Sequence, residues 1–234
     1  MKDIFIIIYK LIRYNIKIIF VNKFVYFFAA NIIVFFITLF IKLYTNEFII
    51  HANDIYNLLL LPGILSIFYY STYGIQDDID NYSIEIVFTV PDYINKIYLV
   101  RLFINFLVIC FILTVLSVIC SYIIIHFPIK KMIFQLSFPI VFLGSLSFYI
   151  FTILHNGDGT AVINTLLGLL IWMTSGFIKT SKWNIILNPF YVPINMNSVQ
   201  WSEIIFNNRL YLSIGTILLI LFSMLNLQKR ENFI

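Results

Sequence analysis

Three aspartates close together are the residues of this chain best placed to do chemistry. Asp77, Asp78 and Asp80 stand within four positions, and carboxylate oxygens are the ligands that Mg²⁺ prefers. Such a cluster could hold a magnesium ion and a diphosphate, but that chemistry needs a second aspartate-rich motif. The only further candidate on the same face of the topology derived below is Asp158, which stands alone. A metal-dependent integral-membrane enzyme is therefore an alternative rather than the main interpretation.

Other catalytic signatures are absent from the sequence. No GxxxxGK[ST] phosphate-binding loop occurs, so the chain has no ATP site of that kind. His51, His126 and His155 are scattered, without an HExxH motif or a Cys/His pair, and no serine has a recognisable partner base. We expect no catalytic residue and no metal site in this chain.

The elements that position these residues must be helices in lipid. Of the 234 residues, 61% are hydrophobic and 11% charged, against roughly 45–50% and about 25% in soluble domains. The mean hydropathy is +0.96, and a transmembrane helix needs about 20 apolar residues. We therefore predict an all-α membrane protein, with residues 1–234 as one transmembrane domain of six spans. The predicted spans, all free of Asp, Glu, Lys and Arg, are Phe24–Ile41, Ile55–Gln76, Leu102–Ile129, Met132–Gly157, Gly159–Ile178 and Leu210–Gln228.

A seventh charge-free stretch, Trp183–Ser202, is interrupted by Pro189, Pro193 and several asparagines. Helix-breaking and polar residues disfavour a clean span, so we predict that residues 179–209 form an extracytoplasmic or re-entrant segment. Seven spans are the alternative. With six, nine of the 15 basic residues fall on the side of both termini and six on the other. The positive-inside rule then places both termini in the cytoplasm.

The first 22 residues have the pattern of a helix that lies in the membrane interface. Lys2, Lys10, Arg13 and Lys17 fall within one arc of such a helix, and most of the isoleucines fall outside it. A basic face opposite an apolar face is typical of interfacial helices. We predict an N-terminal amphipathic elbow helix over residues 1–22.

Within the predicted spans, no acid or base lies near the middle, where ion-driven and proton-driven carriers usually place one. The polar residues there are amides and hydroxyls, among them Asn105, Thr114 and Asn164. We expect these groups to hydrogen-bond between helices. Energy for any transport is therefore expected to come from another subunit.

Residues 77–97, between the second and third spans, are predicted to form a cytoplasmic loop that carries a short helix. The helix over Ser83–Val90 is closed by Pro91, which lacks a backbone donor. One face of this helix is apolar because its hydrophobic residues recur at i, i+3 and i+4. The residues of that face are Ile84, Val87 and Phe88, and Glu85 lies on a neighbouring face.

This loop resembles the corresponding loop of ABC-2 type transporter permeases, which reads roughly E-R-E-x-G-T-L-E-x-L-L-x-x-P and is followed by a basic residue. Here the basic residue is Lys96 or Arg101, while Ile79 stands where Arg is usual and Tyr82 where Gly is usual. The order of elements, from the amphipathic N-terminus through six spans to a basic tail, is also similar. The matching positions are Asp78, Asp80, Ser83, Ile84, Glu85, Val87, Phe88 and Pro91.

The resemblance implies a permease subunit of an ATP-driven exporter in the bacterial cytoplasmic membrane. Ser83–Val90 would be the coupling helix that docks on a separate ABC ATPase subunit, with Asp78 and Asp80 at its acidic rim. Asn156 and Asp158 would form a second cytoplasmic contact. The chain itself would hold no cofactor, because the partner ATPase would bind ATP and Mg²⁺. A second copy, or a similar permease, and membrane lipid are the other expected partners; nucleic acid is not expected.

The substrate class is inferred from the same resemblance. Small permeases of this layout suggest an amphipathic substrate, a peptide or bacteriocin, and the chain's 25 Phe and 15 Tyr would suit it. Besides the integral-membrane enzyme, a non-transporting immunity or scaffold protein is the alternative function.

Overall fold

The computed structural model describes residues 24–45, 51–80 and 94–228, and these ranges form six long helices. The described part of the chain contains no strand, so the prediction of an all-helical protein is confirmed. A single π-helical turn, η1 (Ile94–Leu99), leads directly into the third long helix. The six helices are α2 (Phe24–Thr45), α3 (Ala52–Asp80), α5 (Val100–Ile123), α6 (Ile129–Leu154), α7 (Gly157–Ser175) and α8 (Ser198–Leu227).

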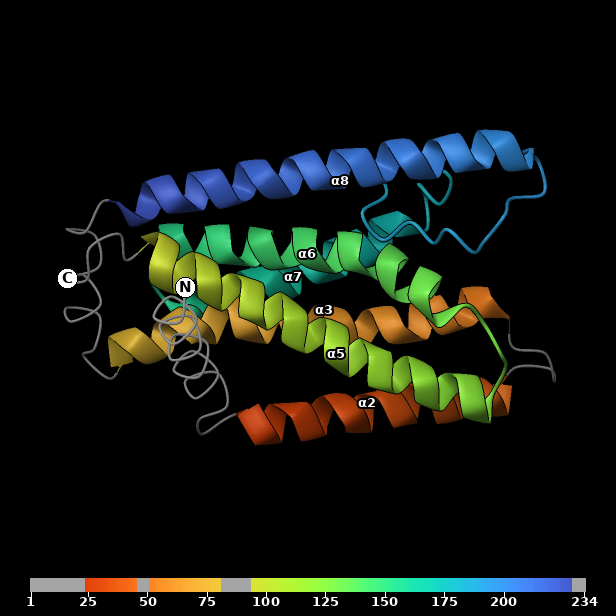
Figure 1. The fold of residues 1–234 in the computed structure, drawn as a ribbon, viewed down its shortest axis with the longest axis horizontal. Coiled ribbons are helices and arrows are strands. Elements are labelled where there is room, and N and C mark those ends of the chain that lie inside the picture. The colour runs from red at the N-terminus through yellow and green to blue at the C-terminus, as the bar shows by residue number, and fades with distance from the viewer. Residues whose placement is uncertain (1–23, 46–50, 81–93, 229–234) are drawn as a thin grey trace, which may run out of the picture.

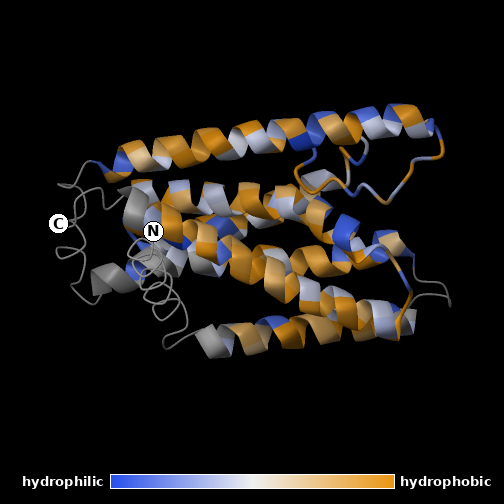
Figure 2. Ribbon diagram, viewed as in Figure 1, coloured by the Kyte–Doolittle hydropathy of each residue, from blue (hydrophilic) through white to orange (hydrophobic). Residues whose placement is uncertain are grey.

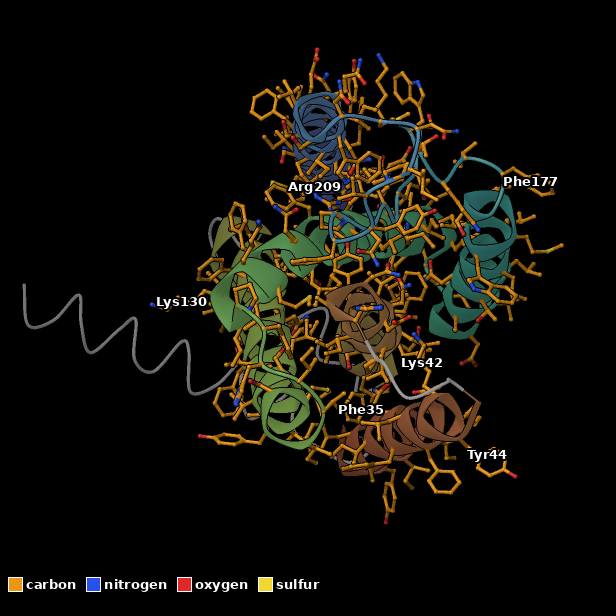
Figure 3. The ribbon with its side chains drawn as sticks, turned by 90° about the vertical axis from the view of Figure 1, so that its right-hand side faces the viewer. Phe35, Lys42, Tyr44, Lys130, Phe177 and Arg209 are labelled. Carbon is orange, nitrogen blue, oxygen red and sulfur yellow. The ribbon has the colours of Figure 1, made fainter. Side chains whose placement is uncertain are left out.

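Successive helices run in alternate directions through one bundle (Figure 1). The bundle therefore has an Asp80 end, where α3 and α6 finish and α7 begins, and an Asn53 end, where α3 and α8 begin and α7 finishes. Viewed from the Asn53 end, α3 lies at the centre and packs against α2, α5, α6 and α7, while α8 packs against α6 (Figure 3). α3 therefore contacts four of the other five long helices.

Each predicted span overlaps one of the six helices, and three helical segments are long and apolar enough to cross a membrane. These segments are Ile97–Ile123, Ile129–Leu154 and Ser198–Leu227. Figure 2 shows that hydrophobic residues predominate along the helices, with hydrophilic residues at several helix ends and within α8. These findings are consistent with a membrane protein. The count of six spans stays a prediction.

Two boundaries differ from those expected from the sequence. The last helix, α8, begins at Ser198, 12 residues before the predicted span start at Leu210. A charge ends a membrane span but not a helix, and the 18 residues from Leu210 to Leu227 alone measure about 27 Å, close to the thickness of a bilayer core, about 30 Å. Helices also extend into both sides of the predicted loop 77–97, because α3 continues through Asp80 and η1 begins at Ile94.

Several predictions fall outside the residues that the structure describes. They are the elbow helix at 1–22 and the coupling helix with its residues Ser83, Ile84, Glu85, Val87, Phe88 and Pro91.

The helix ends around α7 and α8 follow from local sequence. The side-chain oxygen of Asn156 accepts a hydrogen bond from the Gly159 backbone at 2.9 Å and caps the start of α7. At the start of α8, Asn197 and Gln200 form a reciprocal capping box. The carboxamide oxygen of Asn156, predicted as a partner contact, is thus engaged within the chain.

Tight packing between α3 and α6 depends on a glycine. A Cβ added to Gly144 would clash with Cγ1 of Ile67 on α3, so only a residue without a side chain lets the two helices approach this closely. Small residues serve the same purpose in many membrane helix pairs. The core around this contact draws on four helices and includes Phe35, Leu59, Ile109 and Leu136, each at most 1% exposed.

Candidate functional site

The predicted cytoplasmic contacts that the structure describes lie together at the Asp80 end. Asp78 and Asp80 belong to the last residues of α3, and Asp158 lies exposed in the first turn of α7. The side-chain oxygen of Gln76, four residues before Asp80, accepts a hydrogen bond from the Gly157 backbone at 2.8 Å. The acidic end of α3 therefore adjoins the turn between α6 and α7.

A buried polar cluster joins three helices close to this end. The amino group of Asn164 on α7 donates to the Ser147 hydroxyl on α6 at 2.6 Å and to the Thr72 hydroxyl on α3 at 3.3 Å. The two hydroxyls are themselves 3.2 Å apart. The expectation that Asn164 hydrogen-bonds between helices is confirmed, whereas Thr114 bonds to the Cys110 carbonyl of its own helix.

Beyond this cluster, α7 stands away from the bundle. Its buried residues, Gly157, Thr160 and Asn164, all lie in its first eight positions. Farther along, large side chains such as Leu169 and Trp172 are 52% and 69% exposed. Because only the first half of α7 is packed, space opens between its second half and α3.

This space is a cavity of about 780 Å³ between α3, α7 and the segment of residues 176–197. Its length is apolar, because Leu61, Ile64 and Leu65 of α3 face Leu169 and Trp172 of α7 across it. Several of these lining side chains are also exposed on the molecular surface, so the cavity opens sideways as well. Its volume lies within the range of ligand pockets, roughly 300–1,000 Å³.

The Asn53 end of the cavity is polar instead. Four asparagines line it, two from the start of α3 and two from the 176–197 segment, together with one cation. These lining residues are Asn53, Asn57, Asn184, Asn188 and Lys179. The cavity is thus amphipathic along its axis.

A buried arginine holds the 176–197 segment over this end. Arg209 of α8 is 6% exposed, and Figure 3 places it on the side of α8 that faces the bundle. Its guanidinium donates to the Leu187 carbonyl at 3.0 Å, the Tyr56 hydroxyl at 3.3 Å and the Gln135 side chain at 2.9 Å. It also donates to the Asn208 side chain at 2.9 Å. Arg209 therefore connects α8, α6 and α3 to the segment.

Asparagine side chains complete the attachment. The amino group of Asn208 donates to the carbonyls of Lys182 and Asn184, both at 2.8 Å. That of Asn188 donates to the Asn53 carbonyl at 2.9 Å and to the side-chain oxygens of Asn53 and Asn57 at 2.7 and 3.0 Å. The segment is consequently packed onto the ends of the helices, with Leu187 and Asn184 buried.

An ion pair joins the neighbouring helices at the same end. Lys42 near the end of α2 and Asp54 in the first turn of α3 are 2.5 Å apart. Burial alone would raise the pKa of Asp54, but the hydrogen bonds from Lys42 and the His51 backbone, together with the lysine charge, outweigh it and lower the pKa. Asp54 is therefore ionised at neutral pH.

The sequence predictions missed Arg209 and the asparagine group as site residues. Arg209 served there only to orient the chain, and the asparagines only to disfavour a span. The concentration of amides in Trp183–Ser202 was the available signal, since amides of this kind often fasten irregular backbone.

Comparisons of this chain with protein-family models, with curated proteins and with solved structures find no match. What the geometry supports is a helical protein with membrane-length apolar segments and a ligand-sized amphipathic cavity at one end. The function is inferred from these features and from the loop motif.

Proposed function

We propose that this chain is the membrane-spanning permease subunit of an ATP-driven exporter of the ABC-2 type. It moves an amphipathic substrate, a peptide or bacteriocin, across the bacterial cytoplasmic membrane with energy from a separate ATPase subunit. The observation that carries the proposal is the cavity between α3 and α7, apolar along its length and lined by amides at one end. A substrate with a polar and an apolar part would match both regions.

The two ends of α3 suit two separate roles, docking of the ATPase subunit at one end and substrate binding at the other. Its 29 residues form a rod about 43 Å long, with the acidic residues at one end and the cavity's asparagines at the other. A partner that docks on the loop after Asp80 would push on the same helix that lines the cavity. Rigid helices transmit such displacements between subunits.

The unequal packing of the two halves of α7 also supports transmission of movement from the docking end to the cavity. Gln76 and the Asn164 cluster fix its first half to α3 and α6, while its second half has no buried residue. A movement of α3 would therefore carry the start of α7 with it and change the separation of the two helices along the cavity. The permease would use this change to alter access to the bound substrate.

The remaining partners follow from the family. ATP and Mg²⁺ belong to the ATPase subunit, and a second copy of this chain or a similar permease completes the transporter. Six spans with both termini in the cytoplasm would put the Asp80 end on the ATPase side and the Asn53 end outside.

The test is co-purification of the protein from its host in a mild detergent, with ATPase activity measured on the complex. A nucleotide-binding subunit should elute with the chain, and its ATPase rate should change upon association. Glu85→Lys and Asp158→Lys, at the proposed docking end, should weaken the complex. Glu203→Lys makes the same charge reversal on α8 near the opposite end and should leave it intact.

Two results would contradict the proposal. If no ATPase elutes with the wild-type protein, the permease function fails and a non-transporting immunity protein becomes the better interpretation. If Glu85→Lys and Glu203→Lys weaken the complex equally, the partner does not dock at the Asp80 end.

A further inference from the structure

We propose that the Asn53 end of the cavity binds the anionic head group of an amphiphile whose apolar tail lies between α3 and α7. That amphiphile would be the substrate of the proposed permease. Only its role as a transported substrate rests on the proposed function; the binding itself does not. The hydrogen-bonding state of the asparagines that line the polar end supports such a head group.

The orientation of the Asn188 amide is determined by backbone groups. Its side-chain oxygen accepts a hydrogen bond from the Phe190 N–H at 3.0 Å, and its amino group donates to the Asn53 carbonyl at 2.9 Å. A backbone N–H can only donate and a carbonyl can only accept, so the two ends of this amide are assigned without ambiguity. The groups that face its nitrogen must therefore be acceptors.

Those groups are the side-chain oxygens of Asn53 at 2.7 Å and Asn57 at 3.0 Å. With both oxygens occupied, the amino groups of Asn53 and Asn57 are left without a partner among the described residues. Asn184 repeats the pattern, because its side-chain oxygen accepts from the Ile186 N–H at 3.2 Å. Asn184 is only 4% exposed and lines the cavity, so its amino group is a donor held at the cavity wall.

The polar end therefore offers amide donors, while the amide oxygens of its asparagines are engaged. Lys179 adds a positive charge that no carboxylate within the described ranges neutralises. Three amide donors and an ammonium match a head group rich in acceptors and negatively charged, a carboxylate or a phosphate. A quaternary ammonium head has no acceptor to offer these donors and would meet a like charge.

The end of the cavity nearer Asp80 offers no free amide or hydroxyl donor among the described residues. Both described donors that line it are engaged within the bundle: the Asn164 amino group with Ser147 and Thr72, and the Thr165 hydroxyl with the Ala161 carbonyl. An anionic head is consequently favoured at the Asn53 end only. This fixes the direction in which an amphiphile lies.

The apolar part of the cavity has the length of a lipid tail. From Leu60 to Phe68, both lining residues, the rise of α3 is about 12 Å, close to the depth of one leaflet of a bilayer core, about 15 Å. A tail of that length would lie along Leu61 and Leu65, which are 42% and 37% exposed. Because these side chains also reach the molecular surface, the tail can enter sideways from the membrane.

Binding is tested on the purified chain in nanodiscs of neutral phosphatidylcholine, with probes that share one tail. Dodecyl phosphate, dodecyl maltoside and dodecyltrimethylammonium differ only in the head group, and the partition of each into the bilayer is measured on nanodiscs without the protein and subtracted. The readout is the fluorescence of Trp172, which lines the cavity, taken as the signal that is lost in Trp172→Phe. Dodecyl phosphate should bind about tenfold or more tightly than the other two, as expected for a hydrogen-bonded charged group.

The matched variants are two lysines three residues apart. Lys179→Gln should weaken dodecyl phosphate binding about tenfold, and Lys179→Glu should reverse the preference toward dodecyltrimethylammonium. Lys182→Gln removes the same charge from a lysine that lies 5.6 Å from the rings of Trp183 and Tyr211 and does not line the cavity. This control should bind as the wild type does.

A second pair of probes distinguishes the sources of the anion. An apolar peptide with a free C-terminal carboxylate is compared with its C-terminal amide. Preference for the free acid assigns a peptide terminus to the site, and binding of dodecyl phosphate alone assigns a lipid phosphate; each supports an anionic head.

Equal binding of dodecyl phosphate and dodecyltrimethylammonium, or no effect of Lys179→Gln, would overturn the inference. None of these measurements needs the ATPase. Anion-selective binding without a co-purifying ATPase would therefore count against the permease function alone. A co-purifying ATPase without anion-selective binding would count against the head-group site alone.

Discussion

Arg209 gives the sharpest test of how the 176–197 segment is held in place. Replacing it with methionine keeps much of the side-chain volume but removes the hydrogen bonds to Leu187, Tyr56, Gln135 and Asn208. At a net value of about 1 kcal/mol each, these bonds amount to roughly 4 kcal/mol.

Two further contributions adjust this figure. The guanidinium also lies 5.7 Å from the centre of the Phe138 ring, which adds about 0.5–1 kcal/mol. In the other direction, methionine avoids the desolvation of a buried cation, and such replacements recover a substantial part of the loss. We therefore expect Arg209→Met to destabilise the protein by about 2–3 kcal/mol, or a fall in Tm of roughly 4–12 °C for a chain of this size.

The assay combines thermal unfolding in a mild detergent with limited trypsin digestion. Arg209 orients Asn208, whose amino group holds the Lys182 carbonyl, so cleavage after Lys182 should be faster in Arg209→Met. Tyr56→Phe removes only the hydroxyl between Arg209 and the Leu187 carbonyl and should cost about 1 kcal/mol.

Lys131→Met serves as the matched control, because Lys131 is an exposed cation in the first turn of α6. It should change neither the Tm nor the cleavage rate. Were Arg209→Met to behave like Lys131→Met in both measurements, Arg209 would not be what holds the segment in place.

Three further predictions concern the helix contacts. Gly144→Ala should destabilise the protein by about 1–3 kcal/mol through overpacking, whereas Gly168→Ala, whose nearest neighbour would be 3.7 Å from the new Cβ, should not lower the Tm; an equal loss in both variants would show that close packing at Gly144 is not the cause. Asn164→Leu should lower the midpoint of unfolding in SDS by the equivalent of about 1–2 kcal/mol, and an unaltered midpoint would mean that the three-helix cluster adds no stability. Because the ion pair with Lys42 lowers the pKa of Asp54, its contribution is present above about pH 4 and is lost as the pH falls through the folded-state pKa. The advantage of the wild type over Asp54→Asn, about 0.5–1 kcal/mol at pH 7, should thus shrink as the pH is lowered below about 4, and a constant advantage would show that charge is not involved.

The existence of the helices could be predicted because it depends on local composition. Long runs without charge favour helices in lipid, and each predicted run overlaps one helix. The boundaries were less predictable where a helix extends beyond the apolar run. At α8 the capping box of Asn197 and Gln200 marks the start, and Glu203 and Arg209 continue the helix past the expected membrane edge.

The site could not be predicted because its parts are distant in sequence. Asn188 bonds to Asn53, 135 residues earlier, and Arg209 bonds to Tyr56, 153 residues earlier. Composition indicates that amides are present but not which ones meet. The cavity itself results from the unequal packing of the two halves of α7, and apolar residues in both halves look alike in the sequence.

The attachment of the 176–197 segment has a consequence for chemical ageing. Asparagines in exposed loops lose their amide slowly when the next backbone nitrogen attacks the side-chain carbonyl to form a succinimide. The residue after Asn188 is Pro189, whose nitrogen has no hydrogen, so this route is closed at the amide that bridges Asn53 and Asn57. The order Asn–Pro thus keeps the Asn188 amide, one of the groups that hold the segment, from the usual route of deamidation.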